Sequence, residues 1–202
     1  HAAKTFHDHL HKWFQETADM PAATSDKCLY VRRNKQGEVI LVAATWVDDV
    51  LLAGEPQAVQ DFRKEIAQHF SVRDFGEPKD FVGCEISRDI EKGIGTFKQT
   101  KYIEKMGERY GVQALQGYGP CAPMDYSIKL APSSDTDQRA DPTDYRSIIG
   151  ALHYCAHCTR PDISASVSIL SKFLADPNTA HMKQALKVLE YLLWSKHIGL
   201  TY

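Results

Sequence analysis

The sequence predicts an α+β fold in which an antiparallel sheet with helices on one face is followed by a mainly helical region. The first observation is that strand-like runs rich in Val, Ile and Leu share residues 1–112 with amphipathic helical patterns. The second is that residues 113–141 are richer in Gly, Pro, Ser and Asp and show little periodicity, which is typical of a linker. The third is that helical signals return in residues 142–202. These three ranges are the predicted domains.

The first domain is predicted to begin with three strands between two helices. Apolar side chains at three- and four-residue spacing predict helices over residues 4–17 and 56–70. Between them, the pattern predicts a strand over 28–32, a turn over 34–37 and a hairpin over 38–53. The second helix is predicted to carry on one face Val59, Phe62, Ile66 and Phe70.

The rest of the first domain is predicted to add a strand pair and a third helix. Residues 81–88 and 95–98 predict two strands that pair around a turn containing Gly. Residues 101–110 predict a helix that ends at Gly111, because glycine readily adopts the left-handed conformation of a helix C-terminus.

Capping residues mark the helices of the last domain. Asp141 is a good N-cap residue, and Pro142 follows it at the first helical position. Thr159 is followed three residues later by Asp162, which predicts a capping box. Thr179 is predicted to cap the last helix. The apolar stripe of that helix is predicted to be Met182, Leu186, Leu189 and Leu193.

The most informative motif is a pair of adjacent carboxylates, Asp48 and Asp49, between two apolar runs. Acids rarely lie within buried strands unless something positive meets them, because an uncompensated buried charge costs several kcal/mol. A hairpin that turns at residues 47–49 would present both carboxylates at the edge of a sheet, where oxygen ligands suit Mg²⁺. On pattern alone, a turn that uses the two Asp residues only for local hydrogen bonds explains the motif equally well.

Residues 46–54 read Trp-Val-Asp-Asp-Val-Leu-Leu-Ala-Gly. They resemble the Tyr-Val-Asp-Asp box, with its continuation, in the reverse transcriptase of Ty1/copia-type retrotransposons. Further segments resemble blocks of the same family in the same order, and together they extend over nearly the whole chain. These segments are residues 75–88, 99–103, 120–124, 145–154 and 159–163.

The resemblance implies the C-terminal half of a polymerase palm at residues 1–112 and helices of a thumb and connection at 142–202. It also implies DNA synthesis on an RNA or DNA template-primer, with two Mg²⁺ ions at the attacking 3′-hydroxyl and the leaving pyrophosphate. Asp48 and Asp49 match the catalytic, metal-binding positions of the box. Trp46 replaces the usual Tyr, which implies an altered contact near the primer end.

Three basic residues of the helical region are candidates for nucleic-acid contact in the family setting. Arg160 could touch a phosphate, although packing beside the predicted capping box is the better explanation. Lys183 and Lys187 either face nucleic acid or form the solvated face of the last helix. The net charge of −2 gives no basic stripe by composition, which counts against duplex binding by this chain alone.

The family's palm uses a third metal-binding Asp, which lies on an earlier strand. None of the acids that precede the box lies in an apolar strand-like run; these acids are Asp8, Glu16, Asp19, Asp26 and Glu38. Two carboxylates alone hold Mg²⁺ weakly, because the ion demands several oxygen ligands in near-octahedral geometry. We therefore expect that this chain does not polymerise by itself. The alternative is a transposon-derived domain retained as a non-catalytic structural or protein-interaction subunit, with a protein as its partner.

The cysteines and the hydropathy bear on the cellular compartment, on zinc binding and on membrane insertion. Five scattered Cys residues predict free thiols in an intracellular, reducing compartment, the cytoplasm or the nucleus. Cys155, His157 and Cys158, with His153 nearby, invite a zinc interpretation, but we do not expect zinc because a second ligand pair with suitable spacing is not evident. No apolar run approaches the roughly 20 residues that span a bilayer.

Overall fold

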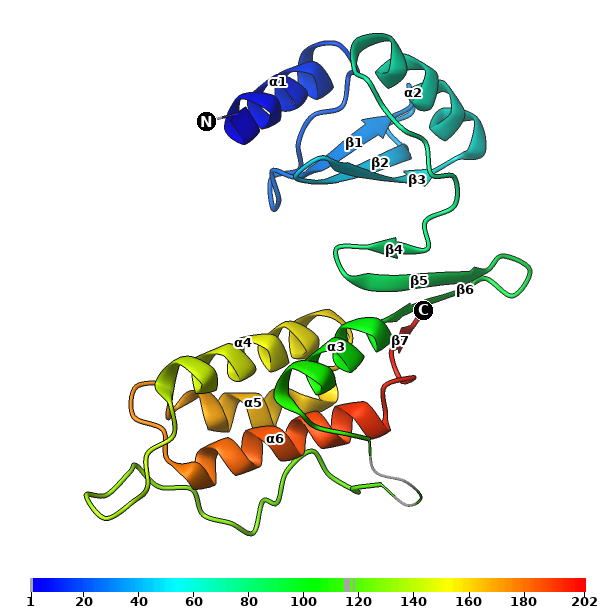
Figure 1. Cartoon of the computed structure of the whole chain (residues 1–202). Coiled ribbons are helices and arrows are strands. Elements are labelled where there is room, and N and C mark those ends of the chain that lie inside the picture. The colour runs from blue at the N-terminus through cyan, green and yellow to red at the C-terminus, as the bar shows by residue number, and fades with distance from the viewer. Residues whose placement is uncertain (1, 115–116, 118) are drawn as a thin grey trace. The chain divides into compact units, whose positions relative to one another are not determined.

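The computed structural model describes residues 2–114, 117 and 119–202 (Figure 1). The described residues form a mixed α/β structure with two small antiparallel sheets and six α-helices. The chain divides into two compact units, residues 1–78 and 79–202. No helix among the described residues is long and apolar enough to cross a membrane.

The division between the units differs from the predicted domain organisation. It falls within the predicted first domain, and the predicted linker lies inside the second unit. The reason is a set of contacts between residues far apart in the sequence. Ile103 and Met106 belong to the same hydrophobic core as Leu189 and Leu193, which lie in the last helix of the chain.

The first unit places two helices over one three-stranded antiparallel sheet, whose strand order is β1-β2-β3 (Figure 1). Its elements are α1 (Ala2–Glu16), β1 (Leu29–Arg33), β2 (Val39–Trp46), β3 (Asp49–Gly54) and α2 (Pro56–His69). All five confirm predicted elements to within about three residues at each end.

Alternation along β2 explains how this unit builds its core. Leu41 and Ala43 are fully buried, and they share a core with Phe14 of α1 and Phe62 of α2. Intervening residues of β2 such as Val42 are less buried, because successive side chains of a strand point to opposite faces. The predicted apolar face of α2 is confirmed, since Phe62 and Ile66 are buried.

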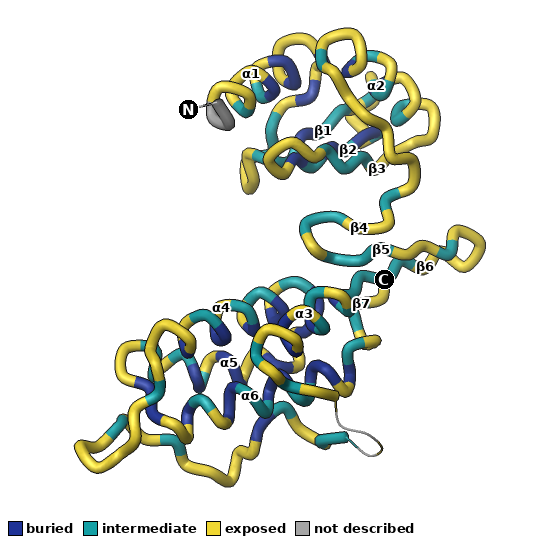
Figure 2. The backbone as a smooth tube through the Cα atoms, viewed as in Figure 1, coloured by how far each residue is buried: buried dark blue, intermediate teal, exposed yellow. Residues whose placement is uncertain are grey.

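The second unit combines a four-stranded antiparallel sheet with a helical core. The sheet has the order β4-β5-β6-β7 and consists of β4 (Asp80–Phe81), β5 (Cys84–Asp89), β6 (Ile94–Lys98) and β7 (Leu200–Thr201). The helices are α3 (Thr100–Tyr110), α4 (Pro142–Cys158), α5 (Ser164–Ser171), α6 (Thr179–Trp194) and the short 3₁₀ helix η1 (Pro161–Ile163). Figure 2 shows buried residues concentrated in these helices, whereas the described part of the connection between α3 and α4 is largely exposed.

Two predicted helix ends are confirmed. Gly111 ends α3 with a φ of 65°, which is the left-handed conformation expected there. Asp141 caps α4, because its side chain accepts hydrogen bonds from the backbone N–H groups of Thr143 and Asp144.

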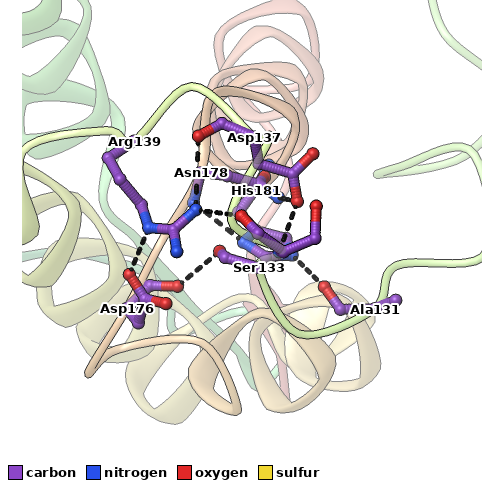
Figure 3. Close-up of polar contacts among 8 residues, drawn as sticks. Ala131, Ser133, Asp137, Arg139, Asp176, Asn178 and His181 are labelled. Carbon is purple, nitrogen blue, oxygen red and sulfur yellow. Dashed lines mark hydrogen bonds and ion pairs between the residues drawn. The ribbon is translucent and has the colours of Figure 1, made fainter.

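Two other capping predictions are wrong. Thr159 is not the N-cap of a helix: it is the C-cap of α4, and its hydroxyl donates to the side chain of Gln99, at 2.7 Å. The N-cap of α6 is Asn178, and Thr179 is the first helical residue. In this cap, the Asn178 side chain accepts from the His181 N–H at 3.0 Å, and the His181 Nδ1 accepts from the Asn178 N–H at 3.1 Å (Figure 3).

The predicted apolar stripe of α6 is confirmed but incomplete. Leu189 and Leu193 are buried, and the half-buried Met182 and Leu186 pack against the same core. The fully buried apolar positions also include Ala185, Val188 and Leu192. The buried face is wider than one stripe because α6 packs against α3, α4 and α5.

Candidate functional site

The predicted hairpin turn lies between β2 and β3. Trp46 pairs with Asp49 as the last rung of this antiparallel ladder, so Val47 and Asp48 form a two-residue turn. Val47 has a φ of 53°. A β-branched side chain is strained in this region, and the first position of such a turn ordinarily favours Gly.

The side chains of this turn are open to solvent. Trp46 is 56% exposed and Val47 is 64% exposed, and both Asp48 and Asp49 are exposed. Within the described residues, neither carboxylate takes part in a side-chain hydrogen bond or ion pair. The local hydrogen bonds on which the turn-only explanation depends are therefore not found there.

A shallow cavity of about 310 Å³ borders the turn. It is lined by His7, Cys28, Thr45, Trp46, Val47 and Asp48. All of these residues belong to the first unit, so α1, the residue before β1, the end of β2 and the turn together shape the space beside one of the two carboxylates.

The carboxylates at the turn are of the ligand type that Mg²⁺ prefers, but two of them are too few to complete its coordination. Asp48 and Asp49 offer carboxylate oxygens, the ligands that Mg²⁺ prefers, and their exposure leaves room for water and phosphate ligands. Among the residues that the structure describes, no group of three or more His, Cys, Asp or Glu side chains is arranged to hold a metal ion. The arrangement therefore provides two protein ligands and depends on others to complete the coordination.

The structure places Arg160 in the interior of the second unit. Its guanidinium is fully buried, and it donates to both carboxylate oxygens of Asp162, at 2.9 and 2.7 Å. It also donates to the backbone carbonyl of Ser195 at 3.0 Å. Tyr191 donates its hydroxyl to the same carboxylate of Asp162 at 2.8 Å. The phosphate contact predicted for Arg160 is not supported, and the packing role is.

The two lysines of α6 have different surroundings. Lys183 is exposed, whereas Lys187 is half-buried beside a shallow pocket that is also lined by Asp125 and Glu190. Hydrogen bonds from Ser127 lower the pKa of Asp125, and Lys187 adds a smaller electrostatic contribution in the same direction. Nucleic-acid contact by either lysine stays a prediction.

The residues of the zinc interpretation lie on different sides of α4. Cys155 is buried in the core, while His153 and His157 are exposed and stack on each other with ring centroids 4.3 Å apart. Cys158 instead lies near Cys84 of β5, where it contributes, after burial, to the raised pKa of the Cys84 thiol. The sequence interpretation missed this neighbour, because Cys84 and Cys158 are far apart in the sequence.

One family model and several known proteins are similar to this chain. Residues 1–124 match the family model described as reverse transcriptase (RNA-dependent DNA polymerase). The putative transposon Ty5-1 protein of Saccharomyces cerevisiae is 31% identical over 175 residues, covering 86% of this chain and 55% of that protein. The retrovirus-related Pol polyprotein from transposon RE1 of Arabidopsis thaliana is 32% identical over 179 residues, covering 88% of this chain and 12% of the polyprotein.

A further relative extends the same similarity to another plant. The Pol polyprotein from transposon TNT 1-94 of Nicotiana tabacum is 28% identical over 172 residues, covering 83% of this chain and 13% of the polyprotein. The chain thus spans about half the length of the yeast relative and about an eighth of the two polyproteins. No solved structure matches the chain.

Proposed function

This chain belongs to the reverse transcriptase family of Ty1/copia-type retrotransposons, and from that premise we propose that it contributes Asp48 and Asp49 to a two-metal site for nucleotidyl transfer. In this proposal the first unit is part of the polymerase palm. The helices of the second unit supply thumb and connection elements. The substrate is a template-primer of RNA or DNA together with a nucleoside triphosphate, in an intracellular, reducing compartment.

The observation that carries the proposal is the pair of unengaged carboxylates on a strained turn. Asp48 and Asp49 are adjacent, exposed and without a described side-chain partner, while Val47 holds an unfavourable φ. Two neighbouring negative charges repel each other, and backbone strain costs about 1–3 kcal/mol. Natural proteins keep locally unfavourable conformations of this kind mainly at functional sites.

The residues of the chain would divide the work at this site. Bound Mg²⁺ would neutralise charge on the attacking 3′-oxygen and on the leaving pyrophosphate. Asp48 and Asp49 would hold the metal through carboxylate oxygens, and the antiparallel ladder beneath them fixes their positions. The exposed indole of Trp46 would offer a flat apolar surface to the end of the primer.

A third ligand has a natural place beside β3. This strand lies at the edge of its sheet in the described residues, and it begins at Asp49. A further strand that carries an Asp would pair with this edge through backbone hydrogen bonds and bring its carboxylate close to the first two. We therefore propose that the 202-residue chain alone does not polymerise and that a segment with this strand completes the site.

Nucleotide incorporation tests the proposal directly. We expect no incorporation of labelled nucleotide by the 202-residue chain with a primed template and Mg²⁺. In a longer protein that contains this chain and an upstream Asp-bearing strand, we expect incorporation that Asp48→Asn lowers at least about 100-fold. Asp8→Asn, at an exposed position of α1, is the matched control and should keep full activity. Incorporation by the longer protein that survives Asp48→Asn contradicts the assignment.

The alternative function is a non-catalytic domain that binds another protein. The observation that favours it is the two-ligand donor set together with the net charge of −2, since neither suits tight binding of Mg²⁺ or nucleic acid by this chain alone. For such a domain, Asp48→Ala would leave partner binding unchanged, and activity would be absent from the longer protein as well.

A further inference from the structure

The side chains of Cys84, Cys158 and Tyr154 lie close together, where the start of β5 lies against the last turns of α4. Tyr154 and Cys158 are four residues apart in α4, so they share one face of the helix. The Tyr154 hydroxyl donates to the backbone carbonyl of Val82, just before Cys84 begins β5. After burial, which is the larger cause, Cys158 contributes to the raised pKa of the Cys84 thiol, and both cysteines contribute to the raised pKa of Tyr154. The hydrogen bond to Val82 and the helix face that Tyr154 shares with Cys158 bring Cys84 and Cys158 close together, although they come from distant parts of the sequence.

The surroundings hold this cluster in place. The ring of Tyr154 packs edge-on against Tyr102 of α3, with centroids 5.0 Å apart. Gly83 lies close to the hydroxyl of Tyr154, because an added Cβ at Gly83 would lie only 3.1 Å from the hydroxyl oxygen. Both thiols are free and half-buried, so they are pre-positioned and still within reach of a small oxidant.

The other cysteines of the second unit lack this arrangement. Cys155 is fully buried among core residues, where burial raises the pKa of its thiol to about 12. Cys121 is exposed, and no side-chain hydrogen bond involves it in the described part of the chain. It provides a reference for the oxidation of an ordinary surface thiol.

We propose that Cys84 and Cys158 form a reversible disulfide when the protein meets hydrogen peroxide. One thiolate attacks the peroxide, so that an S–O bond forms, the O–O bond breaks, and a sulfenic acid and a first water result. The second thiol attacks the sulfenic sulfur, so that the S–S bond forms and a second water leaves. In total the two thiols lose two protons and two electrons, and one peroxide is reduced to two waters. Added thiols reverse the reaction by exchange.

The bond would join the β4–β5 hairpin to a central helix of the second unit. Val82, in the turn of this hairpin, has a φ of 50°, and the disulfide would add a covalent restraint next to this strained residue. Burial raises the pKa of the Cys84 thiol to about 11, so its reactive thiolate is scarce at neutral pH. The pair therefore suits slow oxidation under sustained exposure to peroxide.

Non-reducing peptide mapping of the whole chain tests the proposal. The reduced protein is treated with hydrogen peroxide, its remaining thiols are blocked with N-ethylmaleimide, and it is digested with trypsin and analysed by tandem mass spectrometry. The expected product is a linked pair of peptides that carry Cys84 and Cys158, with fragment ions that separate Cys158 from Cys155. The expected rise in Tm is about 10 °C, and dithiothreitol should reverse it.

Matched variants decide between a specific and an incidental disulfide. Cys84→Ser and Cys158→Ser should each abolish both the linked peptide and the rise in Tm, and Cys121→Ser should change neither. A linked peptide that is missing from the oxidised wild-type protein overturns the proposal, as does a bond that involves Cys155. Equal pairing of Cys84 with Cys121 and with Cys158 also overturns it. Because mapping of the wild-type chain needs no variant, these outcomes do not depend on the folding of the Ser variants.

Discussion

Two hairpin turns of this molecule each contain a valine with a positive φ, but the contacts around the two valines differ. Val47 in the first unit and Val82 in the second have φ values of 53° and 50°. A left-handed conformation costs an L-residue about 1–2 kcal/mol. Tyr154 supports Val82 through the hydrogen bond to its carbonyl. Val47 is 64% exposed, and the described structure has no side-chain hydrogen bond at its turn.

The difference separates strain that the fold compensates from strain that it does not. At Val82, packing within the same unit offsets the cost, so the turn is part of the architecture. At Val47 no such contact among the described residues offsets the cost, and the strained residue lies beside two unpaired carboxylates. Backbone strain of this kind is concentrated at functional sites. This contrast supports assigning a substrate or partner contact to the Val47 turn.

The largest expected effect comes from removing the support of the second turn. Tyr154→Ala should destabilise the second unit by about 3 kcal/mol, because it removes both the ring packing and the hydrogen bond to Val82. Tyr154→Phe keeps the ring and should cost about 1 kcal/mol. Hydrogen–deuterium exchange should accelerate in residues 80–89 and stay unchanged in residues 39–54. Equal acceleration in both segments would mean that the two turns are not independent.

A second prediction concerns pH, to which the second unit should respond and the Val47 turn should not. His181 is fully buried, and burial lowers its pKa from the ordinary 6.5, although a hydrogen bond to the Ala131 carbonyl and the charges of Asp137 and Asp176 act in the opposite direction (Figure 3). Its neutral Nδ1 accepts from the Asn178 N–H. A protonated Nδ1 would instead point its own N–H at the Asn178 N–H, so that the hydrogen bond would be lost.

The sign of the pH effect follows from the lowered pKa. The stabilisation by His181 is present above pH 6.5 and is lost as the pH falls through the lower pKa of the folded state. We expect a loss of about 1 kcal/mol, the usual value of an N-cap, in urea titrations of the second unit between pH 7 and pH 5. His181→Gln keeps a hydrogen-bond acceptor that does not titrate, so it should flatten this dependence. An unchanged slope in that variant would assign the titration to another group.

Local patterns predicted turns and helix ends better than they predicted contacts between distant residues. The turn at Asp48 and the caps at Gly111 and Asp141 follow from short-range preferences, which the sequence displays directly. The partner of Thr159 is Gln99, far away in the sequence, so a local capping rule could not identify it. The burial of Arg160 depends on Ser195 in the same way. The boundary between the two compact units also depends on contacts between distant residues, which local patterns do not display.

A third prediction relieves the strain of the unsupported turn. Val47→Gly should stabilise the first unit by about 0.5–1 kcal/mol, because relief of about 1–2 kcal/mol exceeds the entropic cost of the added glycine. The exposed Val47 side chain gives up little packing. Val50→Gly, in the extended strand β3, should instead destabilise it by about 1 kcal/mol. The measurement is the urea dependence of exchange protection in residues 39–54. Destabilisation by Val47→Gly would show that the turn is already optimal.

The smallest expected effect isolates the charge on the turn. Without divalent cations, Asp48→Asn should stabilise the first unit by about 0.3 kcal/mol, because it removes repulsion from Asp49, and added salt should reduce this gain. Asp8→Asn, the exposed control in α1, should show no comparable gain. A gain means that the carboxylate of Asp48 is retained at the expense of stability, as a ligand of a metal site would be. A loss would mean that Asp48 stabilises its own turn, which would favour the turn-only explanation over the proposed metal site.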